Sequence, residues 1–235
     1  MLIQANKTSI FRENEELLPF VLKYLKKIPK KNLENSVLAV TSKIVALSER
    51  RTRELKNKKD KIKLIKKESD FILNKNFLFT LKDGMVMAFA GIDESNGDGK
   101  LILLPKDSFK SAAILRKKLI QKYNLKNLGV LITDSGFIPL RSGAVGMAIG
   151  YAGFQGVKNY IGKKDIFGRV LKMSKTNIAD SLAASAVLSM GEGSERQPLA
   201  IITNVPVVFT EKMNKKEMKI NIKKDIYAPL FNKLS

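Results

Sequence analysis

The chain lacks both cysteine and histidine. Without cysteine it can form no disulfide, no thiolate nucleophile and no zinc–thiolate centre. Without histidine it cannot assemble Ser-His-Asp or Cys-His catalytic machinery, and it has no imidazole to bind a metal. Any metal that side chains hold must therefore be held by oxygen, which favours Mg²⁺, Mn²⁺ or Ca²⁺.

Long apolar runs are also missing. No stretch approaches the ~20 residues that cross a bilayer, and residues 1–11 lack the apolar core of a signal peptide. We therefore expect a cytoplasmic protein with no membrane partner. The 235 residues are 44% hydrophobic, which suffices for one large domain or for two small lobes with cores.

Acidic residues are few relative to basic ones, because 43 Lys and Arg stand against 22 Asp and Glu and give a net charge of +21. Such an excess is typical of proteins that bind nucleic acid or anionic membranes. Most of it is lysine, whereas arginine, the preferred bidentate reader of bases and phosphates, is scarce. We therefore favour a compositional habit of the source proteome over a nucleic-acid partner. A non-enzymatic polyanion binder stays the alternative.

The spacing of apolar residues predicts an α+β fold, with mixed sheets, a β-hairpin and flanking helices, rather than a regular βαβ array. The hairpin joins residues 77–81 to residues 85–90 through Lys82-Asp83-Gly84. The predicted N-caps are Asn14, Ser108 and Thr176. The expected helices cover residues 15–28, 108–123 and 176–190, with an exposed basic helix within 50–68, and the expected strands cover 37–40, 128–132 and 199–203.

Two clusters of oxygen-bearing side chains follow apolar segments. Asp93-Glu94-Ser95-Asn96 comes shortly after the segment 85–90, and Thr133-Asp134-Ser135 ends the segment 128–132. Clustered oxygens beside apolar residues are costly unless something binds them, and a hard cation would do so. Taken alone, each cluster is more often a polar turn. Two such clusters together suggest one site assembled from two places.

Two further segments have groups that can face phosphate. Thr41-Ser42-Lys43 offers hydroxyls and an ammonium at a strand end, although the P-loop pattern is absent. Residues 191–196 follow a helix and carry Glu192 as a candidate metal ligand. Residues 41–43 could equally be an exposed helix start, and residues 191–196 a solvated loop after a C-cap. The spacing alone does not decide between these accounts and phosphate binding.

In their order and spacing, these segments resemble the coenzyme F420-0:L-glutamate ligase family of γ-glutamyl ligases. The resemblance covers about residues 37–202, and each motif is weak by itself while the shared order is specific. The motifs are Val40-Thr41-Ser42-Lys43-Ile44-Val45, residues 90–96, Leu103-Leu104-Pro105, residues 129–135, Ala148-Ile149-Gly150, Phe167-Gly168-Arg169 and Met190-Gly191-Glu192.

The resemblance implies a ligase that adds L-glutamate through an amide bond to an acceptor carboxylate of the coenzyme F420-0 type. An acyl phosphate would be the intermediate, and a nucleoside diphosphate and phosphate would be released. GTP, or ATP in its place, would be the co-substrate, with Mg²⁺ or Mn²⁺ and a monovalent cation as a further candidate. A folate-like acceptor is the alternative within the family. The resemblance also implies that residues 1–235 form one unit with two intertwined lobes, and that the protein is an intertwined homodimer.

Carried over position by position, the resemblance places metal ligands at Asp93, Asp134 and Ser135, where the family more often has threonine than serine. Glu192 is a further candidate ligand. The predicted catalytic residues are Asp93, Asp134 and Lys43.

The resemblance places nucleotide contacts at Ser42, Lys43 and Asn96 and on the loop 190–197. Glu94 matches no family position and is expected to be dispensable. This chain departs from the family at Leu47, which replaces a nucleotide-facing lysine, and at the poorly matched residues 9–11. The loop residues assigned to the nucleotide are Gly191, Gly193, Ser194 and Glu195.

Overall fold

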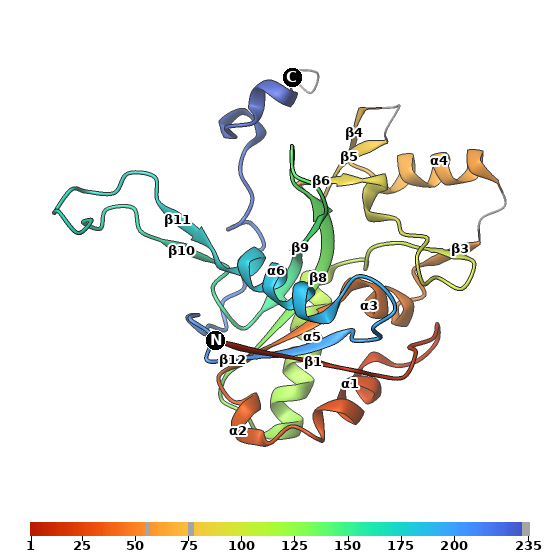
Figure 1. Cartoon of the computed structure of the whole chain (residues 1–235), viewed down its shortest axis with the longest axis horizontal. Helices are drawn as coiled ribbons and strands as arrows, with labels where there is room; N and C mark the ends of the chain where they lie inside the picture. The colour runs from red at the N-terminus through yellow and green to blue at the C-terminus, as the bar shows by residue number, and fades with distance from the viewer. Residues whose placement is uncertain (55–56, 75–77, 232–235) are drawn as a thin grey trace.

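A five-stranded mixed sheet forms the centre of the computed structural model, which describes residues 1–54, 57–74 and 78–231 (Figure 1). Its order is β1-β12-β2-β8-β9, and only β2 and β8 run parallel within it. β2 ends at Thr41, which lies opposite Thr133 in that parallel pair, whereas β8 continues to Phe137. The strands are β1 (Leu2–Asn6), β2 (Ser36–Thr41), β8 (Leu128–Phe137), β9 (Ala144–Ala152) and β12 (Leu199–Thr203).

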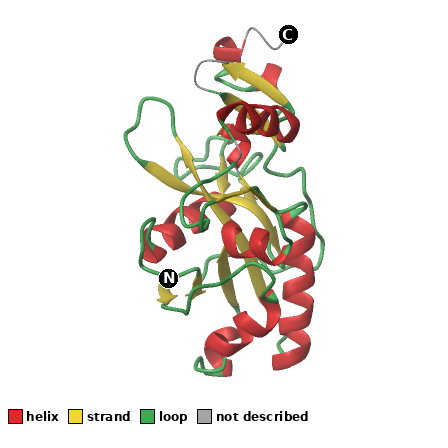
Figure 2. Cartoon of the chain, turned by 90° about the vertical axis from the view of Figure 1, so that its right-hand side faces the viewer, coloured by secondary structure: helices red, strands yellow, loops and turns green. Residues whose placement is uncertain are grey.

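Both faces of this sheet are covered, because successive residues of β2 point into two different cores. Leu38 and Val40 belong to the core that includes residues of α1, α3 and α5, whereas Val37 and Ala39 pack with α6. Figure 2 shows helices on both sides of the strands. The helices are α1 (Leu17–Leu25), α2 (Lys30–Leu33), α3 (Ser42–Ser48), α5 (Ser108–Tyr123) and α6 (Ile178–Met190).

A second, smaller group of elements lies between α3 and α5 in the chain. Its own core contains Ile65, Ile92 and Leu101, while Met87 belongs to the main core and so joins the two groups. The two-lobed arrangement stays a prediction. The elements are α4 (Lys58–Glu68), the pair β3 (Thr52–Glu54) and β7 (Lys100–Ile102), the sheet β4 (Phe71–Asn74), β5 (Phe79–Lys82) and β6 (Met85–Ala88), and the 3-10 turn η1 (Phe89–Gly91).

Two segments extend beyond the sheet and its helices. The pair β10 (Val157–Asn159) and β11 (Lys175–Asn177) begins an arm, residues 157–177, that projects from the body (Figure 1). The segment after β12 contains η2 (Ile222–Lys224) and η3 (Ala228–Phe231). It is attached to the body by ion pairs from Glu211 to the buried Arg116 and from Lys215 to Asp107, the latter at 2.6 Å.

The predicted α+β class is confirmed, and the predicted strand 199–203 matches β12 residue for residue. The predicted helix ends at Tyr123 as α5 does, but α5 already begins at Ser108, the predicted cap. The strand predicted at 128–132 is longer, because β8 continues to Phe137 paired with β9. Residues 79–82 and 85–88 form the hairpin, and the predicted strand residue Phe77 lies outside the described residues. The basic segment 50–68 is helical only from Lys58 within its described part.

The three predicted N-caps are wrong, each by one or two residues. Asn14 has a φ of 75° and precedes the cap position of α1, which Glu16 takes without a side-chain hydrogen bond. Asp107 caps α5 in place of Ser108, and Asn177 caps α6 in place of Thr176. Their side-chain oxygens accept hydrogen bonds from the amides of Lys110 and Asp180. Among the described helices, none combines the length and the apolar character that a membrane crossing requires.

Candidate active site

A cavity of about 1100 Å³ lies where the end of β2 and the second half of β8 meet three loops. The loops are residues 8–13, residues 91–98 and residues 190–198. The cavity is bordered by all of the residues predicted for metal, nucleotide or catalysis: Ser42, Lys43, Asp93, Asn96, Asp134, Ser135, Gly191, Glu192, Gly193, Ser194 and Glu195.

Lys43 and Asp93 form an ion pair across the cavity wall. Lys43 lies in the first turn of α3, directly after β2, and its Nζ is 2.8 Å from Asp93 Oδ2. Ser95 supports the pair, because its amide and hydroxyl donate to Asp93 at 2.7 and 2.9 Å and its carbonyl accepts from Lys43 at 3.0 Å. Burial raises the pKa of Asp93, but the hydrogen bonds from Lys43 and Ser95 outweigh it and hold the pKa below the ordinary value.

Asp134 is in a different electrostatic environment from Asp93. Its Oδ1 accepts a hydrogen bond of 3.0 Å from the hydroxyl of Ser42, and it makes no ion pair within the described residues. Burial, with a smaller contribution from the charge of Asp93, raises the pKa of Asp134 to about 6, although Ser42 and the Ser135 amide act in the opposite direction. One carboxylate of the site is thus paired with a lysine, whereas the other forms no ion pair within the described residues.

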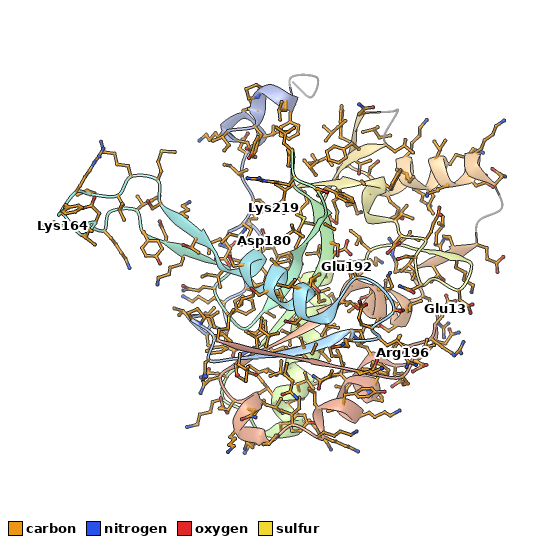
Figure 3. All side chains as sticks on the ribbon, in the orientation of Figure 1. Glu13, Lys164, Asp180, Glu192, Arg196 and Lys219 are labelled. Carbon is orange, nitrogen blue, oxygen red and sulfur yellow. The ribbon has the colours of Figure 1, made fainter. Side chains whose placement is uncertain are left out.

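The loop after α6 contacts both oxygen clusters. Ser135 donates a hydrogen bond of 2.6 Å to Glu192 Oε1, and Asn96 Nδ2 lies 3.5 Å from the carbonyl oxygen of Gly193. Gly191 ends α6 with a φ of 82°, and a Cβ there would lie 2.4 Å from Glu195 Cδ. The predicted end of this helix at residue 190 is confirmed, and the conformation of the residue after it favours glycine. Figure 3 shows Glu192 and Arg196 on this loop.

The donor atoms at this end of the cavity fit a hard divalent cation in their chemistry. Asp134 forms no ion pair in the described chain, and the buried hydroxyl of its neighbour Thr133 has no hydrogen-bond partner there. Ser135 and Glu192 add further oxygens. The described residues do not gather three acidic side chains closely enough to define a metal site by themselves. Of the four predicted metal ligands, Asp93 is paired with Lys43, whereas Asp134, Ser135 and Glu192 form no ion pair within the described residues.

Sequence reasoning missed an ion pair on another wall of the same cavity. Lys100 Nζ lies 2.7 Å from Glu13 Oε2, and the hydroxyl of Thr52 donates to the same carboxylate. The hydrogen bonds from Lys100 and Thr52 lower the pKa of Glu13. No local pattern marks these residues, because Glu13 lies in an irregular loop and Lys100 in a three-residue strand. The contact exists only in the folded chain.

A strained turn leads directly into the Asp93 cluster. Phe89, Ala90 and Gly91 all have positive φ values, of 55°, 56° and 70°. Left-handed conformations cost roughly 1–2 kcal/mol for each residue that carries a Cβ. Hydrogen bonds fix the turn, because the Ala90 amide donates to Thr80 Oγ1 at 2.9 Å and that hydroxyl donates to a backbone carbonyl. Such strain is frequent at functional sites and persists where its surroundings over-determine it.

The chain belongs to the F420-0:Gamma-glutamyl ligase family, whose model matches residues 6–204. It is 37% identical over 206 residues to a coenzyme F420:L-glutamate ligase of Methanococcus maripaludis strain S2, covering 86% of this chain and 81% of the relative. It is 45% identical over 144 residues to the protein of the same name from strain C7, covering 61% of this chain and only 58% of that relative. A coenzyme F420:L-glutamate ligase of Archaeoglobus fulgidus is 34% identical over 193 residues, with 74% and 77% covered.

Proposed function

We propose that this chain is a nucleotide- and divalent-metal-dependent γ-glutamyl ligase. It would join the amino group of L-glutamate to an acceptor carboxylate of the coenzyme F420-0 type. The observation that supports this proposal most strongly is the single cavity, which is bordered by every residue that the family resemblance assigns to metal, nucleotide or catalysis. The names of the relatives are consistent with the same reaction.

The chemistry explains why such an enzyme needs a nucleotide. A carboxylate is a poor electrophile, so its oxygen first attacks the γ-phosphorus, and the bond to the leaving diphosphate breaks. The amine of glutamate then attacks the acyl carbon, an amide bond forms and phosphate leaves with the electron pair of the broken C–O bond. The amine must also lose a proton, which a cavity carboxylate can accept. A bound divalent cation would neutralise charge on the phosphate groups.

The residues of the cavity suggest a division of work. Lys43 carries an ammonium that can hydrogen-bond a transferring phosphate oxygen, and Asp93 keeps that ammonium in place at 2.8 Å. Asp134 would hold the cation with Ser135 and Glu192. Ser42, Asn96 and the loop 190–197 would contact the nucleotide. Without a nucleotide, that loop already contacts both oxygen clusters, at Ser135 and at Asn96.

The test is an incorporation assay with labelled L-glutamate, in which coenzyme F420-0 and a folate are each offered with GTP or ATP and with Mg²⁺ or Mn²⁺. We expect labelled product with an F420-0-type acceptor only when nucleotide and metal are both present. Product with the folate alone would favour the alternative acceptor. If no combination gives product, while an oligonucleotide binds with an affinity that falls steeply with salt, the polyanion binder replaces the ligase.

We also propose a homodimer, and the arm supplies its support. Residues 157–177 extend from the body, and Ile166 and Phe167 near the tip are 91% and 90% exposed. Large apolar side chains in such a position are typical of an interface, here with a second copy of the chain.

Light scattering after size exclusion should therefore give twice the chain mass of 26.2 kDa. The substitution Phe167→Ser should shift the protein towards the monomer by weakening burial of the ring. Ile226→Ser, at an 80% exposed residue outside the arm, serves as the matched control and should leave the dimer intact. A monomeric mass for the unmodified chain at micromolar concentration would reject the dimer.

A further inference from the structure

The strained turn contains an aromatic residue that borders the cavity and is not buried. Phe89 has the left-handed φ of 55° described above, and the residue borders the cavity while it stays 37% exposed. By contrast, Phe11 also borders the cavity but is buried in the main core, where its ring packs edge-on against Phe20. The strain at Phe89 is therefore not offset by burial in any core of the described residues.

The ring of Phe89 is nevertheless held in place. Lys61 Nζ stands 5.0 Å from the ring centroid, and the same ammonium is paired with Glu94. The amide of Phe89 donates to the carbonyl of Leu78 at 3.0 Å, which attaches the turn to the start of the hairpin sheet. An aromatic residue with a strained backbone that stays exposed beside a cavity is a candidate for contact with a ligand that enters the cavity.

A second aromatic side chain borders the same cavity from another element. Phe137 ends β8, three residues after Asp134, and it is 60% exposed. Phe89 in turn precedes Asp93 by four residues. In the sequence, an aromatic residue that borders the cavity therefore lies within four positions of Asp93 and of Asp134. A ligand with a flat ring and a carboxylate could place the ring against these aromatics and the carboxylate near Lys43.

We propose that Phe89, assisted by Phe137, binds the planar ring of the acceptor by stacking and so selects ring-bearing carboxylic acids as acceptors. This inference rests on the proposed ligase function and adds the residue that would distinguish one acceptor from another. Stacking is tolerant of the identity of a flat ring, because every aromatic ring offers a π-face. Phe89 would accordingly set the class of acceptor, while the carboxylate defines the reacting atom.

The test is the substitution Phe89→Asn, chosen because asparagine tolerates a left-handed backbone better than phenylalanine does. We expect the KM for coenzyme F420-0 to rise about tenfold, as removal of a stacked ring requires, with the KM for nucleotide unchanged. We expect Tm to stay constant or to rise by about 2 to 4 °C, because strain is relieved. Phe89→Tyr should keep the acceptor KM of the unmodified chain, whereas Phe89→Leu should raise that KM as Phe89→Asn does.

Phe71→Ala is the matched control, since Phe71 on β4 is 44% exposed in the same group of elements but does not border the cavity. It should leave the KM for the acceptor unchanged. An unchanged acceptor KM in Phe89→Asn, or a marked fall in its Tm, would overturn the inference by showing that the ring serves the fold alone. Absence of product from the unmodified chain would instead reject the ligase. In that case, fluorescence titration of the unmodified chain and its three Phe89 variants with coenzyme F420-0 still decides whether the ring binds a flat acceptor.

Discussion

The substitution Asp134→Asn is expected to reduce the rate of glutamate incorporation by about a hundredfold or more, because a charge that acts on the transition state is lost. Asp134 lies within β8, three residues before the strand ends, with Ser42 as its side-chain hydrogen-bond donor. Asparagine keeps the shape and one acceptor oxygen, so the fold should remain intact. Steady-state kinetics with saturating nucleotide and metal, together with thermal unfolding, measure the two effects separately.

The stability of Asp134→Asn should not fall at neutral pH, because burial already disfavours the ionised carboxylate. The pKa of Asp134 is raised from 3.8 to about 6 in the folded chain, so the unfolded chain binds fewer protons between these values and folding costs more as the pH rises through them. Any gain in Tm for the variant should therefore grow up to about pH 6 and vanish below about pH 4. Asp83→Asn, in the hairpin turn outside the cavity, is the control. Full activity of Asp134→Asn would remove this residue from the site.

The substitution Asp93→Asn is expected to reduce turnover to a similar extent, again about a hundredfold or more. It removes the carboxylate that holds Lys43 at 2.8 Å, so the ammonium loses its main restraint. The neighbouring carboxylate offers a close comparison, because Glu94 is exposed, pairs with Lys61 and has no contact with Lys43. Glu94→Gln should retain turnover within about twofold, since exposed ion pairs contribute little. Equal losses in the two variants would contradict a specific role for Asp93.

A double-mutant cycle can show whether Asp93 and Lys43 act as one unit. Lys43→Met should also lower turnover, because the ammonium is the group proposed to meet the transferring phosphate. If the two residues work together, the double variant Asp93→Asn/Lys43→Met should be scarcely slower than either single variant. If the two losses of activation free energy are strictly additive, the Asp93 carboxylate and the Lys43 ammonium act through separate contacts.

The sequence predicted the elements that depend on local patterns of apolar residues. Strand β12 was predicted at its observed bounds because residues 199–202 form a short continuous apolar run, and helix α5 was predicted to its observed end because Ala112, Leu115 and Leu119 repeat at helical spacing. The N-caps were missed because Ser, Thr, Asp and Asn compete for the same position, and sequence alone does not show which oxygen reaches the N3 amide. Asp107 and Asn177 hold that place in the structure.

The predicted site residues could be named from ordered motifs, but their electrostatic roles could not. Asp93 and Asp134 read alike in the sequence as acidic residues that follow apolar segments. Their difference arises from Lys43, which reaches one of them from another strand end, and from the burial of the other. Glu13 and Lys100 are separated by 87 positions, and their contact follows from tertiary packing that no local pattern records.

The cavity is built from segments that are remote along the chain, from Thr8 to Pro198. The amide of Thr8 donates to the carbonyl of Arg196, and the amide of Thr41 donates to that of Pro198, so the two extremes of this range meet beside the cavity. A ligand bound there bridges the beginning and the end of the family-matched region at once. Nucleotide should consequently protect the whole chain against heat and proteolysis, with Tm rising as its concentration exceeds Kd, because only the completely folded chain possesses the site.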